Sequence, residues 1–214
     1  RKRLNGCSVK TILEDTIMKM FKKLMAVALA GVMALAVLTG CGSSVNEKEV
    51  IAVINDAIKA PLGKVVEDET GEKNVEITFK AADSELKNKT KAVAGIVEEK
   101  IGEKDTIDTI LTSKKEAIFD ALAGKDRKDT NMYIVSYATK VKYDSKLFNT
   151  LNEGINALEI AENITKDKVV YVSDEVANYE TKGTGMMAFQ DVTVNGKTYT
   201  IVVMKVDTQK KATK

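Results

Sequence analysis

The chain has 214 residues, with 33 Lys and Arg against 31 Asp and Glu, two cysteines and no histidine. The lack of histidine excludes Ser-His-Asp and Cys-His catalytic sites and every metal site that needs a histidine ligand. Arginine occurs only at Arg1, Arg3 and Arg127, so the guanidinium contacts that recognise phosphates and base edges are scarce, and we expect no nucleic-acid partner.

Residues 1–17 do not have the composition of a secretion signal. Glu14 and Asp15 stand where such a signal is basic, and the segment carries one of the two cysteines, Cys7. We therefore expect residues 1–17 to be a non-native upstream segment, with translation starting at Met18 or Met20.

Residues 18–40 have the layout of a signal peptide. Lys19, Lys22 and Lys23 form a basic start, and an uncharged apolar run of about 15 residues follows from Leu24 to Leu38. A helix that crosses the bilayer permanently needs about 20 apolar residues. The run is therefore predicted to be the hydrophobic part of a cleaved signal.

The run ends in Leu38, Thr39, Gly40 and Cys41, which resemble the lipobox of bacterial lipoproteins. The resemblance implies that a signal peptidase recognises Leu38, Thr39 and Gly40 and cleaves before Cys41. It also implies a covalent lipid, diacylglycerol with a further acyl chain such as palmitate, on Cys41. Residues 41–46 would then be a flexible tether.

This resemblance fixes the expected location and partners. We expect a lipid-anchored protein on the extracytoplasmic face of the cell membrane, with no cofactor apart from the lipid on Cys41. The alternatives are that Cys41 follows a conventional signal peptide, or that the apolar run is a short uncleaved anchor. Past Cys41 the chain has no cysteine, so we expect neither a disulfide nor a thiolate metal site.

Residues 47–207 are predicted to be a single α+β domain. Apolar residues at helical spacing predict a helix over about 47–60 that stops at Pro61-Leu62-Gly63. Alternation predicts a strand over 75–80. Asp83-Ser84 then begins a helix that ends at Gly102.

The next helix and strand follow from capping and alternation. Ser113-x-x-Glu116 is the pattern of a capping box for a helix ending at Leu122. Strict alternation over 131–143 predicts the longest strand of the domain. A helix capped by Asp144-Ser145 and continuing to Ala161 follows it.

The C-terminal part is predicted to be β-rich. Residues 169–172 fit a short buried strand, and 189–194 and 197–206 flank Asn195-Gly196, the pattern of a type I′ hairpin. Residues 208–214 are expected to be a disordered, Lys-rich tail. Together these elements predict a mixed sheet of about five strands with a C-terminal antiparallel hairpin and with helices mainly on one face.

Two sets of residues are candidates for a site. Ser84-x-x-Lys87, together with Lys182 before Gly183-Thr184, is similar to the motifs of the serine penicillin-recognising enzymes, although the order Lys-Thr-Gly is not kept. The resemblance implies a serine nucleophile and a lysine base. Separately, Tyr133, Tyr137 and Tyr143 share one strand face, which would suit a sugar or peptide ligand; the alternative is that they are half-buried sheet surface.

The functional expectation is a non-catalytic binding or envelope-associated module whose partner is an envelope polymer or protein. The alternative is a cell-surface hydrolase that uses the Ser/Lys set or a pair of carboxylates. Sequence alone cannot choose a carboxylate pair among so many acidic residues, and no calcium-loop pattern is present.

Overall fold

The computed structural model describes residues 47–99, 101–139, 159–164 and 169–212. Its helices are α2 (Glu47–Thr70), α3 (Ser84–Glu98), α4 (Ile107–Ser113) and α5 (Lys115–Ala123), with a 3-10 turn η1 (Val176–Asn178). Its strands are β1 (Thr78–Ala81), β2 (Met132–Thr139), β3 (Val169–Tyr171), β4 (Tyr179–Val194) and β5 (Lys197–Lys210). Residues 159–164 are also helical.

The five strands form one mixed sheet in the order β1-β4-β5-β2-β3. β1 pairs with β4 in parallel, and the other three pairs are antiparallel. The predicted α+β class and the C-terminal antiparallel pair are confirmed. Asn195 and Gly196 both have positive φ, of 48° and 78°, as the predicted type I′ turn requires.

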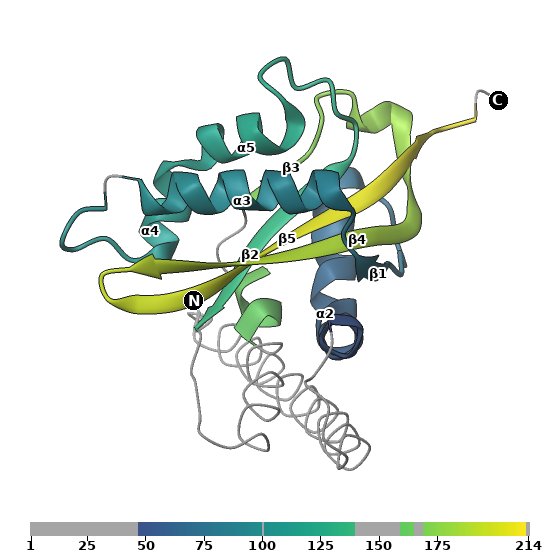
Figure 1. Cartoon of the computed structure of the whole chain (residues 1–214). Coiled ribbons are helices and arrows are strands. Elements are labelled where there is room, and N and C mark those ends of the chain that lie inside the picture. The colour runs from purple at the N-terminus through teal and green to yellow at the C-terminus, as the bar shows by residue number, and fades with distance from the viewer. Residues whose placement is uncertain (1–46, 100, 140–158, 165–168, 213–214) are drawn as a thin grey trace, which may run out of the picture.

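Helices lie on both faces of the sheet (Figure 1), and each face has its own hydrophobic core. α3, α4 and α5 cover one face, where they pack on Tyr133, Val135 and Val203. α2 covers the other face, where it packs on Met132, Ile134 and Val202. Three of the four complete described helices therefore share a face, as predicted. The longest helix lies on the opposite face, which the sequence analysis did not anticipate.

α2 does not end at Pro61. The helix continues to Thr70 with Pro61 inside it, so the predicted stop is wrong. Proline removes one backbone hydrogen bond from a helix interior and is normally disruptive there. Here the apolar stripe continues past it, because Ile58, Leu62 and Val65 are almost completely buried. Burial of this stripe against the sheet outweighs the cost of the proline.

Several predicted boundaries change. Asp83 caps α3 as predicted, through a 2.8 Å hydrogen bond from the Leu86 N–H, but the helix ends at Glu98 and not at Gly102. The capping box lies at Thr106 and Thr109, which begin α4, so the prediction of one at Ser113 is wrong. The Ser113 hydroxyl instead donates to the Ile110 carbonyl.

Strand lengths also differ from the prediction. The described part of the 131–143 strand is β2, with eight residues, whereas β4 has 16, so the prediction of the longest strand is wrong. β5 extends to Lys210, and the Lys211 N–H donates to the Asn178 carbonyl, so the expected disordered tail is ordered at its start. Most of the helix predicted after Asp144 lies outside the described residues.

Candidate functional site

The most elaborate polar arrangement of the described residues centres on Asp129, in the loop between α5 and β2. Its carboxylate accepts hydrogen bonds from the Tyr133 hydroxyl at 2.6 Å and the Lys89 ammonium at 3.3 Å. It also accepts from the Asn131 main-chain N–H at 3.0 Å and side-chain amide at 2.8 Å. We call Glu85, Lys89, Asp129, Asn131 and Tyr133 the Asp129 cluster.

Lys89 is held on three sides by oxygen atoms. Its Nζ lies 2.9 Å from the Tyr133 hydroxyl, 3.0 Å from Glu85 Oε1 and 3.3 Å from Asp129 Oδ2. The ammonium also lies 5.1 Å from the centroid of the Tyr133 ring. Because the Lys89 and Asp129 side chains are only 21% and 20% exposed, this charge pair is screened less than a surface pair would be.

The electrostatics fix the protonation states of the cluster. Burial raises the pKa of Tyr133, and the neighbouring Asp129 carboxylate raises it further. Burial alone would raise the pKa of Asp129, but hydrogen bonds from Tyr133 and Asn131 and the charge of Lys89 outweigh it, so the pKa of Asp129 is lowered. At neutral pH Tyr133 is a neutral donor and Asp129 an anionic acceptor. A tyrosine acting as a base would need the opposite shift.

The loop that carries Asp129 forms hydrogen bonds or ion pairs with several neighbouring elements. The Tyr171 hydroxyl of β3 lies 3.0 Å from the Arg127 carbonyl and 3.2 Å from that of Asp129. The Thr208 N–H of β5 donates to Asn131 Oδ1 at 3.2 Å. The Arg127 guanidinium binds Asp120 of α5 at 3.0 Å. These contacts make the cluster a junction between two helices, three strands and one loop, with its charges paired internally.

The tyrosine face predicted from the sequence is not a surface. Tyr133 is 0% exposed and Tyr137 is 8% exposed, and both belong to the core under α3, α4 and α5. The Tyr137 hydroxyl donates to Asp108, and its ring meets Tyr199 edge to face at 5.8 Å between centroids. Tyr133 and Tyr137 therefore present no exposed face to a ligand in this structure, and Tyr143 lies outside the described residues.

The Ser/Lys set is not brought together. Ser84, Lys87 and Lys182 are all exposed, whereas a lysine base has to be desolvated. The Ala82 N–H donates to the Met187 carbonyl, five residues along β4 from Lys182, or about 16 Å at strand rise. α3 then runs away from Lys182, because its last residue, Glu98, accepts from the Thr193 N–H near the hairpin.

Sequence reasoning missed the Asp129 cluster. Asp129 lies in the charged stretch 125–129, and neither Asp129 nor Lys89 belongs to a motif that the sequence analysis recognised. The two residues are 40 positions apart, and no local spacing signals their contact. The sequence holds one weak signal of this contact. Asp129 lies four residues before Tyr133, so an acidic residue shortly precedes a tyrosine of the predicted strand.

In the described part of the chain, no group of three or more Asp, Glu, Cys or His side chains is placed to hold a metal ion. No helix among the described residues is long and apolar enough to cross a bilayer. Comparisons of the chain with protein-family models, with curated proteins and with solved structures find no match.

Proposed function

We propose that this protein is a bacterial lipoprotein, held on the extracytoplasmic face of the cell membrane by lipid on Cys41. Its α+β domain is a non-catalytic module that binds an envelope polymer or protein. The observation that carries the proposal is the order of features before the domain. A basic start, an uncharged run from Leu24 to Leu38, and Leu38-Thr39-Gly40-Cys41 follow one another without interruption.

The position of the folded domain is compatible with processing at Cys41. The first described helix begins at Glu47, and its first buried core residue is Ile51. Cleavage before Cys41 would thus leave intact both cores as the described residues form them. Each buried methylene of an acyl chain contributes about 0.8 kcal/mol, so two or three chains would hold the domain stably at the membrane.

The non-catalytic part of the proposal draws on the Asp129 cluster. Its acid, base and hydroxyl bind one another, so they are occupied in holding loop 124–131 rather than presented to a substrate. Fixed loops on a rigid sheet are a common way to present a binding surface. We therefore assign the cluster a positioning role beneath the exposed residues of this loop.

The two cysteines supply a matched pair of variants for the test. The full chain, Cys41→Ala and Cys7→Ala are expressed in bacteria fed an alkyne-bearing fatty acid, and the protein is followed by probe attachment, intact mass and membrane fractionation. We expect the probe to be lost in Cys41→Ala and kept in Cys7→Ala, and we expect the mass of the unaltered chain to show a lipid-bearing protein that begins at Cys41. A Cys41→Ala protein that still takes up the probe, or an unaltered chain that carries no lipid, would refute the lipid anchor.

The binding part is tested separately. A chain that begins at residue 45, and so lacks the apolar run Leu24–Leu38, is mixed with purified cell-wall polymer and sedimented, and variants of its exposed loop residues Lys125 and Asp126 are compared with it. Binding that weakens in the loop variants supports the module. Turnover of the polymer by the same protein would instead establish a hydrolase.

A further inference from the structure

We propose that the anchored protein sits with the start of α2 toward the bilayer and with α3, α4, α5 and loop 124–131 facing away from it. In this orientation the α2 side of the domain contacts the lipid surface. This inference rests on the lipid anchor proposed above and adds to it an orientation. It is carried by the length of the chain between Cys41 and α2 and by the layer order of the fold.

The tether is short compared with the domain. Glu47, the first residue of α2, follows Cys41 by six positions. Whatever its conformation, a chain of six residues spans at most about 20 Å. A domain of this size has a radius of gyration of about 15 Å and is therefore roughly 40 Å across. The start of α2 must stay near the membrane, and the far side of the domain cannot reach it.

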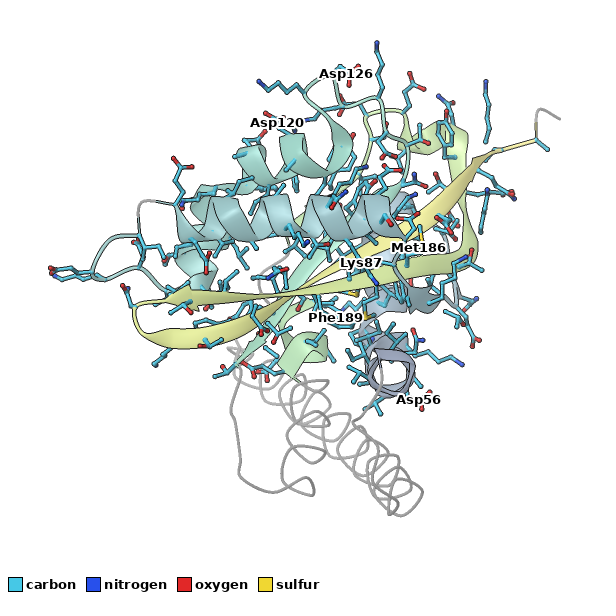
Figure 2. All side chains as sticks on the ribbon, viewed as in Figure 1. Asp56, Lys87, Asp120, Asp126, Met186 and Phe189 are labelled. Atoms are coloured by element: carbon cyan, nitrogen blue, oxygen red, sulfur yellow. The ribbon has the colours of Figure 1, made fainter. Side chains whose placement is uncertain are left out.

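The layer order decides which side is far. α2 covers one face of the sheet, and α3, α4 and α5 cover the other. Figure 2 shows Asp56 on α2 at one side of the sheet and Asp120 and Asp126, on and after α5, at the opposite side. Loop 124–131, with the Asp129 cluster beneath it, therefore lies on the side remote from the tethered helix.

The orientation assigns different tasks to the two helical layers. The α2 layer faces lipid and keeps the tethered end at the membrane. The layer of α3, α4 and α5 carries the exposed loop 124–131 into the extracytoplasmic space. Partners other than lipid would meet this second layer.

The small number of cysteines in the chain allows a fluorophore to be attached at a single chosen position. Cleavage before Cys41 removes Cys7, and Cys41 carries the lipid, so one introduced cysteine is the only free thiol of the processed chain. Asp56→Cys on α2 and Asp126→Cys in loop 124–131 replace exposed residues, and each is labelled with a thiol-reactive fluorophore. The full lipoprotein is reconstituted into phosphatidylcholine–phosphatidylglycerol vesicles with or without a lipid bearing a nitroxide on its headgroup.

We expect a larger fractional loss of fluorescence at position 56 than at position 126. Equal loss at the two positions, or a larger loss at 126, overturns the orientation while leaving the anchor intact, because the protein still floats with the vesicles. Protein that does not float with the vesicles, and whose mass shows no lipid, overturns the anchor and the orientation together. Circular dichroism of both labelled variants checks that the fold is kept.

Discussion

Replacing Asp129 with alanine tests whether its cluster holds the fold together. Asp129→Ala removes the acceptor of the Tyr133 hydroxyl, whose residue is fully buried, and leaves Lys89 with one carboxylate instead of two. A buried donor without a partner costs about 1–3 kcal/mol, and a hydrogen bond to a charged group contributes about 1.5–3 kcal/mol. These contributions overlap, so we expect a loss of about 3 kcal/mol in the free energy of unfolding.

Urea denaturation of a chain that begins at residue 45, without the apolar run Leu24–Leu38, measures this loss, and Asp126→Ala is its control. Asp126 lies in the same loop, but its side chain is 61% exposed and pairs only with the more exposed Lys128. Substitution there is expected to change stability by no more than about 0.5 kcal/mol. The dependence of the unfolding free energy on urea should stay the same in both variants, since the surface exposed on unfolding does not change.

A double-mutant cycle isolates the central contact. Tyr133→Phe keeps the ring in the core and removes only the hydroxyl that donates to Asp129. The two substitutions should couple by about 1–3 kcal/mol, because either one alone breaks the same 2.6 Å hydrogen bond. If Asp129→Ala destabilises no more than Asp126→Ala, or if the cycle shows no coupling, the cluster does not stabilise the fold as argued.

The pH dependence of this stabilisation has a definite sign. The pKa of Asp129 is lowered in the folded state, so its ionised form stabilises the fold above the unfolded pKa, near 4. That stabilisation disappears as the pH falls through the folded pKa. The difference in stability between the wild type and Asp129→Asn should therefore be constant from neutral pH down to about pH 5 and shrink at lower pH. A difference that grows on acidification contradicts this assignment.

Two glycines and one asparagine give further predictions. A Cβ on Gly185 would lie 2.4 Å from the Lys205 carbonyl oxygen and 2.6 Å from the Phe79 ring, so Gly185→Ala should destabilise by about 1–3 kcal/mol in thermal unfolding. Gly95→Ala, with nothing within 4 Å in the interior of α3, should instead stabilise by up to about 1 kcal/mol, and a loss there would contradict the helix assignment. Asn55→Ala removes both hydrogen bonds to the Phe79 N–H and carbonyl, so we expect a loss of about 1–2 kcal/mol and concentration-dependent aggregation through the uncovered β1 edge, as seen by light scattering. Monomeric Asn55→Ala protein at high concentration would show that the edge is protected in another way.

The sequence predicted best where the local backbone allows one answer. Asn195-Gly196 forms the type I′ turn because both residues tolerate positive φ, and Asp83 begins α3 because its side chain can accept the Leu86 N–H. Both features are decided within four residues. They are therefore visible without knowledge of the rest of the fold.

The sequence failed where packing against distant residues decides. Pro61 marks a helix end by local rules, yet burial of Leu62 and Val65 against the sheet carries α2 through it. The capping box at Ser113 matched the pattern, but its hydroxyl bonds to Ile110 within α4 instead. The Asp129 cluster joins residues from α3, a loop and β2, and a contact between positions 89 and 129 leaves no periodic trace in the sequence.

The tyrosines of β2 show how such an error changes a functional conclusion. Alternation placed Tyr133 and Tyr137 on one face, and that part was right, since both lie in the core beneath α3, α4 and α5. Residues at the alternate positions of the same strand, Met132, Ile134 and Ala138, are equally buried beneath the α2 layer. A strand that is apolar on both faces indicates a central strand covered on both sides, where aromatic rings serve packing. Tyr133 and Tyr137 therefore serve the core, and Tyr133 in addition holds loop 124–131 through its hydrogen bond to Asp129.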